Sequence, residues 1–147
     1  MEFHGLIINI HGFVSTLFTL TALTVLVLSV RGWSLKKPYT NWDKKIAILF
    51  LVLLYIQLVL GILLYFVLGH SPKGAESIEA AMEQTSFRYW ALEHFIIMIF
   101  ALFLSQIGWV FIRKSKLDSN KHKNTVFYFG ISILLIIIST GVGLIWR

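Results

Sequence analysis

Two histidines and one glutamate lie within stretches of the chain that are otherwise apolar. His11 falls about five residues into one apolar run, in "NIHGF", and Glu93 and His94 fall about five residues into another, in "ALEHF". An ionisable side chain costs free energy inside a membrane, so one that is kept there indicates a functional site. Imidazoles bind metals and transfer protons. The chain has no cysteine, which excludes disulfides, iron–sulfur clusters, thiolate metal sites and covalent haem attachment through a CxxCH motif.

The rest of the chain predicts four membrane-spanning helices. Of its 147 residues, 57% are hydrophobic and 14% charged, whereas a soluble domain is about a quarter charged. The apolar runs cover about residues 6–30, 46–68, 89–112 and 125–146. Each exceeds the roughly 20 residues that cross a bilayer, and backbone groups in lipid must bond internally, as in a helix. We predict an all-α, single transmembrane domain over 1–147, folded as an up-down-up-down four-helix bundle because the loops are short.

Basic residues set the predicted orientation. The loops at 31–45 and 113–124 hold five Lys or Arg residues each, ten of the 13 in the chain. Short basic loops stay cytoplasmic, so both termini and the loop at 69–88 are expected on the outer, periplasmic side of a bacterial inner membrane. The net charge of +6 is then explained by contact with anionic headgroups, and no nucleic-acid partner is expected. The tryptophans near span ends agree with an aromatic belt: Trp33, Trp42, Trp90, Trp109 and Trp146.

His11 and His94 are predicted to lie at matching depth. Their spans both run inward, and at ~1.5 Å per residue both imidazoles fall roughly 7–8 Å below the outer boundary. The first and third helices of an up-down bundle are diagonal partners, so the two rings would face each other across the core. This arrangement predicts one haem b with His11 and His94 as axial ligands of its iron. The alternative is two unrelated histidines that hydrogen-bond within the core.

Three small or aromatic residues are candidates for contact with the same cofactor. Gly141 and Gly143 of the fourth span and Tyr65 of the second lie at about the depth of the two histidines. Small residues there would let a flat macrocycle approach, although they also mediate ordinary helix contacts in membranes.

Glu93 points about 100° away from His94 around the helix, so it is not expected to bind the same metal position. It is a candidate acceptor for an imidazole N–H on a neighbouring helix, a partner for an arginine, or a proton-transfer group, and it would otherwise reach outward to the interface. Arg88 and Arg147 lie at the outer boundary, where either would meet haem propionates or Glu93.

The remaining polar residues have simpler predicted roles. His122 is expected to be exposed in a basic loop, and His4 and His70 are expected at the outer interface. Gln57 and Gln106 lie deeper in the spans, where hydrogen bonds between helices are the expected role.

The outer loop combines acidic residues with an apolar face. Residues 76, 79 and 83 are glutamates, and Ile78, Met82 and Thr85 are spaced to share one face of a helix. We expect either a short amphipathic helix on the membrane surface or a solvated acidic loop.

Nearly the whole chain resembles the small bacterial four-helix membrane proteins catalogued as "cytochrome B". The resemblance is carried by His11, by "WDKKIAILF" and "IQLVLGILLYF" at the two ends of the second span, by "FRYWALEHFIIM" and by "KHKNTVFYFGISIL". It implies a haem-binding membrane protein with His11 and His94 as the carried-over positions. Where the family has further polar residues, this chain has Thr16, Leu17 and Phe18 in the first span and Tyr55 in the second, so only one haem is expected.

Three functions are therefore open. The first is an electron-transfer cytochrome whose partner is a quinol or another redox subunit. The second is a non-redox accessory or structural subunit of a larger membrane complex, or a homo-oligomer, which docks through its charged loops. The third is a small membrane oxidoreductase or haem-modifying enzyme. An electron carrier or subunit is favoured over a stand-alone enzyme.

Overall fold

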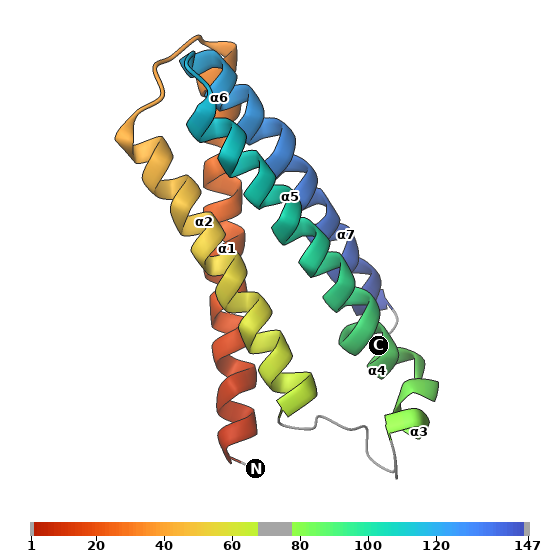
Figure 1. Cartoon of the computed structure of the whole chain (residues 1–147). Helices are drawn as coiled ribbons and strands as arrows, with labels where there is room; N and C mark the ends of the chain where they lie inside the picture. The colour runs from red at the N-terminus through yellow and green to blue at the C-terminus, as the bar shows by residue number, and fades with distance from the viewer. Residues whose placement is uncertain (1, 68–77, 146–147) are drawn as a thin grey trace.

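The computed structural model describes residues 2–67 and 78–145, and these are almost entirely helical (Figure 1). Helix α1 covers Glu2–Ser34, and α2 (Asn41–Ile62) continues into the π-helix η1 (Leu63–Val67). The short helices α3 (Ile78–Glu83) and α4 (Thr85–Arg88) lead through the π-helix η2 (Tyr89–Glu93) into α5 (His94–Lys114). Helix α6 (Asp118–Asn124), the π-helix η3 (Thr125–Phe129) and α7 (Gly130–Ile145) complete the chain.

Four helical segments are long and apolar enough to cross a membrane: Phe3–Ser34, Asn41–Tyr65, Tyr89–Lys114 and Asp118–Ile145. They contain the four predicted spans, apart from residues 66–68 at the end of the second span and residue 146 at the end of the fourth. The fourth segment begins seven residues before the predicted 125, because α6, η3 and α7 run on without a break. Large apolar side chains such as Phe13, Phe103 and Ile145 lie exposed on the outside of the helices. The four segments suggest a multi-pass membrane protein.

The long helices are arranged in two antiparallel pairs, α1 with α2 and α5 with α7 (Figure 1). Helix α2 also contacts α5, and α1 contacts α6 and η3, so α1 and α5 take diagonal positions. This arrangement is compatible with the predicted four-helix bundle. Both ends of the described chain lie at one end of the bundle, hereafter the terminal end. The 35–40 loop and α6 lie at the other, hereafter the basic end.

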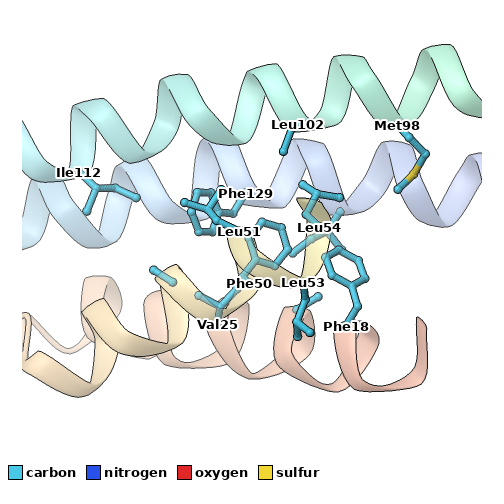
Figure 2. Packing of buried hydrophobic residues seen from close by; sticks show 13 residues of the cluster. Phe18, Val25, Phe50, Leu51, Leu53, Leu54, Met98, Leu102, Ile112 and Phe129 are labelled. Carbon is cyan, nitrogen blue, oxygen red and sulfur yellow. The ribbon is translucent and has the colours of Figure 1, made fainter. Parts of the chain in front are cut away.

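Aromatic rings from three helices form the centre of the core (Figure 2). Phe50 of α2 and Phe129 of η3 are fully buried and stack with ring centroids 4.6 Å apart. Phe18 of α1 packs on the other side of Phe50 at 5.2 Å. In water, burial of each such ring stabilises a fold by a few kcal/mol. In lipid, buried rings stabilise a helix bundle through close packing instead. This cluster joins the two helix pairs.

The connection between α1 and α2 is closed by backbone hydrogen bonds. The Lys37 N–H donates to the Gly32 carbonyl at 2.9 Å, and the Lys36 N–H donates to Trp33 at 3.4 Å. These bonds form a Schellman motif, which requires a left-handed residue at its centre. Lys36 occupies that position with φ 51°, where glycine is the usual residue.

A capping box starts α2. The Thr40 N–H donates to Asp43 Oδ2 at 2.7 Å, and the Asp43 N–H donates in return to Thr40 Oγ1 at 3.4 Å. Each residue thus satisfies a backbone N–H that the first turn of a helix leaves without a partner. The carboxylate of Asp43 is used in this cap.

The prediction that His122 is exposed is wrong, because only 1% of its surface is accessible. Residues 118–124 form α6 instead of a loop, and α6 packs against the last turn of α1. Gly32 makes the room, since a Cβ at that position would lie 2.3 Å from His122 Cε1.

The acidic loop is helical where it is described. Glu79, in the first turn of α3, and Glu83, its last residue, are exposed, and Met82 is partly buried. Four residues named in the sequence predictions lie outside the described residues: His70, Glu76, Trp146 and Arg147.

Candidate functional site

A cavity of about 480 Å³ lies among the four long helices near the terminal end of the bundle. We call it the histidine cavity, because both His11 of α1 and His94 of α5 line it. Segment α2–η1 contributes Gln57, Gly61 and Tyr65 to its wall, and α7 contributes Thr140 and Leu144. Cofactor and ligand sites typically measure roughly 300–1,000 Å³. The volume of the cavity falls within this range, and every long helix contributes to its walls.

A hydrogen bond to α7 orients the ring of His94. His94 Nδ1 lies 2.7 Å from Ser139 Oγ, and the Tyr89 hydroxyl donates to the Ser139 carbonyl at 2.5 Å. Ser139 is buried. When Nδ1 donates its proton to the serine oxygen, Nε2 carries the lone pair, and this is the state in which an imidazole binds a metal. The ring of Trp90, whose centroid is 4.8 Å from that of His94, also lines the cavity.

The π-helix η2 explains how Tyr89 and His94 both reach Ser139. The His94 N–H donates to the Tyr89 carbonyl five residues earlier, so residues five apart stand one above the other on the helix. In an α-helix, residues spaced three or four apart share a face instead. Single π turns inside α-helices occur frequently at functional sites.

The same turn pairs Arg88 with Glu93. Their side chains form an ion pair at 3.5 Å, and they are 48% and 49% exposed. Neither residue lines the histidine cavity. Of the roles that the sequence left open for Glu93, the structure shows the partner of an arginine. Arg88 is engaged with Glu93 on the outside of the bundle.

His11 has a less complete environment than His94. Its Nδ1 is buried and has no hydrogen-bond partner among the described residues. One turn further along α1, Ser15 accepts a hydrogen bond from Gln57 Nε2 of α2. The buried Gln57 Oε1 has no partner among the described residues either. A cofactor that offered a partner to these atoms would therefore fit the cavity better than an apolar molecule would.

The prediction that the two glutamines hydrogen-bond between helices is confirmed. Gln57 bonds to Ser15, as described, and Gln106 Nε2 of α5 donates to the Tyr55 hydroxyl of α2 at 2.7 Å. Tyr55 is exposed on the outside of the bundle, so this second pair is separate from the histidine cavity.

The structure places the predicted glycines behind the cavity wall. Gly141 and Gly143 do not line the cavity, whereas their neighbours Thr140 and Leu144 do. A Cβ at Gly143 would lie 2.4 Å from Trp90 Cζ2, so this glycine allows α7 to pack closely against η2. Contact of either glycine with a cofactor stays a prediction, as does a propionate contact of Arg88, while Tyr65 does line the cavity.

Ser15 and Ser139 were not among the predicted site residues. Ser15 lies four residues after His11, a spacing that places both on one face of α1, and this signal was available in the sequence. Ser139 carried no signal, because its meeting with His94 depends on how α7 is rotated about its axis.

A cofactor that brings most of its own ligands needs few from the protein. Among residues 2–67 and 78–145, no three His, Asp or Glu side chains are grouped so that they could hold a metal ion. The imidazoles in the cavity wall are those of His4, His11 and His94. Haem iron needs only axial ligands from the protein, because the porphyrin supplies the other four nitrogens.

The fold and cavity thus define a helix bundle of four apolar, membrane-length helices with a cavity between them that His4, His11 and His94 line. Comparisons of the chain with protein-family models, with curated proteins and with solved structures found no match.

Proposed function

We propose that the chain is a membrane cytochrome that binds one haem b and carries electrons, with His11 and His94 as the axial ligands of the iron. One observation supports this proposal above the others: both imidazoles line a single cavity of cofactor size, and they come from diagonally placed helices. The resemblance to four-helix cytochrome B proteins points to the same two histidines.

The chain's own residues would divide the work of holding the group. Ser139 fixes the orientation of His94 through Nδ1, and Tyr65 and Trp90 offer aromatic surface to a flat macrocycle. Haem iron would supply one-electron oxidation and reduction. The protein would set the potential through the axial imidazoles, their hydrogen bonds and the exclusion of water.

We place the protein in the inner membrane of a bacterium with the histidine cavity near the outer face. The basic loops support this orientation, because Lys- and Arg-rich loops remain cytoplasmic. The electron partner is then a quinol or another redox subunit that approaches from the membrane or the periplasmic side.

An absorption spectrum of the detergent-purified protein tests the proposal. Protein from haem-replete cells should show a Soret band and, after dithionite reduction, a sharp α-band. His11→Ala and His94→Ala should each lose the bis-imidazole spectrum. His4→Ala is the matched control, because His4 also lines the cavity but is not proposed as a ligand. A colourless wild-type protein would refute the proposal, and loss of the spectrum only in His4→Ala would refute the ligand assignment.

A second candidate is a non-redox accessory subunit of a larger membrane complex. It is favoured by polar groups on the outside of the bundle: the Arg88–Glu93 ion pair and the Gln106–Tyr55 hydrogen bond. Polar side chains facing lipid are costly, and a partner helix would cover them. Photo-crosslinkers placed at position 88 or 106 should then capture one defined partner in cells, whereas a crosslinker at Phe13 should not. Crosslinks to lipid alone would argue against this candidate.

A further inference from the structure

A second cavity lies at the basic end of the bundle, away from the histidine cavity. Its volume is about 180 Å³, and it is bordered by the last turns of α1, the 35–40 loop, the start of α2 and α6. We call it the basic cavity. Its wall includes Arg31, Lys37, Thr40, Asp43 and His122.

His122 is the unexplained residue of this cavity. It is 1% exposed, and neither Nδ1 nor Nε2 has a hydrogen-bond partner among the described residues. A buried imidazole normally hydrogen-bonds through at least one nitrogen, because an unsatisfied polar group loses its hydration without compensation. An occupant of the adjoining cavity is the natural source of the missing partner.

The imidazole is held in place by its neighbours and not by hydrogen bonds. One side packs against the backbone of Gly32, where a Cβ would clash with the ring. Tyr39 lies 5.2 Å away, measured between ring centroids. Burial, and then the nearby Asp43 carboxylate, raise the pKa of Tyr39, so the phenol beside His122 stays neutral. The His122 ring is therefore fixed without using either nitrogen.

The charge of the wall favours an anion. Arg31 and Lys37 line the cavity, and neither forms an ion pair within residues 2–67 and 78–145. The one carboxylate in the wall, Asp43, already accepts hydrogen bonds from the Thr40 N–H and hydroxyl at 2.7 and 2.8 Å. Two cations thus remain without a partner next to an imidazole without a partner.

We propose that the basic cavity binds a phosphate group, which an anionic phospholipid supplies through its headgroup. A guanidinium and an ammonium group are the side chains that best match phosphate oxygens, and an imidazole N–H adds a further donor. The cavity lies at the ends of the membrane-length helices, where lipid phosphates lie. Basic pockets between such helices on the cytoplasmic side are a recurrent form of headgroup recognition. This inference is independent of the proposed haem.

Thermal unfolding of the delipidated full-length protein in a neutral detergent tests this proposal. Added phosphatidylglycerol should raise the unfolding temperature of the wild type, and phosphatidylcholine, whose headgroup has no net charge, should raise it much less. Arg31→Gln and Lys37→Gln should each lose most of the phosphatidylglycerol effect. Lys44→Gln is the matched control, because Lys44 lies in the first turn of α2 at the same end of the bundle but does not line the cavity. His122→Gln keeps a donor and should retain part of the effect.

Two further arms identify the source of the phosphate. Inorganic phosphate and glycerol phosphate should have little effect at concentrations where the lipid saturates. An equal effect of these soluble ions would overturn the lipid assignment and indicate a small phosphorylated ligand. If neither lipid nor soluble phosphate changes the unfolding temperature, the cavity holds only water and the proposal fails. Equal losses in Lys44→Gln and Lys37→Gln would also overturn it, because they would show general attraction of a basic surface.

Discussion

Ser139 Oγ lies 2.7 Å from His94 Nδ1, and this contact connects α7 to the predicted metal-binding face of α5. The backbone carbonyl of the same serine accepts a hydrogen bond from the Tyr89 hydroxyl. One residue of α7 therefore orients the His94 imidazole through Nδ1, while Trp90 packs beside the ring.

Replacing Ser139 by alanine should weaken retention of the proposed haem. The change removes the hydroxyl oxygen next to His94 Nδ1. It leaves intact the hydrogen bond from the Tyr89 hydroxyl to the backbone carbonyl of residue 139. Loss of such a supporting hydrogen bond typically reduces metal affinity by about 10–100-fold, and the reduction potential should shift as well. Haem transfer to apomyoglobin and a redox titration would measure these two effects.

Ser132→Ala is the control for this change. Ser132 is also a buried serine in α7, but it donates to the Ala101 carbonyl at 3.0 Å, away from the histidines. The two variants should lose similar amounts of stability. Equal haem retention in both would show that Ser139 does not act through His94.

The two glycines of α7 should respond oppositely to alanine. At Gly143 a Cβ would lie 2.4 Å from Trp90 Cζ2 and 2.8 Å from Tyr89 Cε1, so Gly143→Ala should destabilise the bundle by about 1–3 kcal/mol through overpacking. At Gly141 nothing lies within 4 Å of an added Cβ, and alanine should stabilise the helix by about 0.5–1 kcal/mol. Unfolding by dodecyl sulfate in mixed micelles would measure both. A destabilised Gly141→Ala would show that a cofactor or partner occupies that space.

The sequence was informative about depth and poor about rotation around each helix axis. Apolar length predicted the four spans, and residue counting placed His11 and His94 at levels that do share one cavity. Gly141 and Gly143 were placed at a similar level but lie behind the wall, because the azimuth of α7 depends on packing against η2. The π turn η2 itself could not be foreseen, since no residue pattern distinguishes "YWALE" from α-helix.

The prediction that His122 is exposed was wrong for a different reason. The seven polar residues "DSNKHKN", 118–124, have the composition of a solvated loop, and composition alone predicts that His122 is exposed. In the structure this segment is helical, and a glycine on α1, 90 residues earlier in the sequence, receives the imidazole. Such a long-range fit between a glycine and a ring leaves no local pattern in either segment.

Glycine at position 36 should stabilise the protein. Lys36 adopts φ 51° at the centre of the Schellman motif, a conformation that costs a residue with a Cβ roughly 1–2 kcal/mol. Lys36→Gly should recover about 1 kcal/mol of this, less the entropy that glycine gains in the unfolded chain. Thermal or dodecyl sulfate unfolding would measure the gain. Lys44→Gly, inside α2, should lose about 1 kcal/mol, and a loss of the same size at position 36 would contradict the motif.

Removing the charge of Glu93 should leave the cofactor site intact. Glu93 pairs with Arg88 at 3.5 Å on the outside of the bundle, with both side chains about half exposed. An exposed ion pair contributes about 0–1 kcal/mol and is screened by salt. Glu93→Gln should therefore cost at most about 1 kcal/mol at low salt and less at high salt.

The haem spectrum and potential should stay unchanged, and so should the rate of electron exchange with a quinol. Arg88→Gln should behave in the same way, because it removes the other half of the pair. Slower electron exchange in Glu93→Gln but not in Arg88→Gln would instead show that the carboxylate transfers protons.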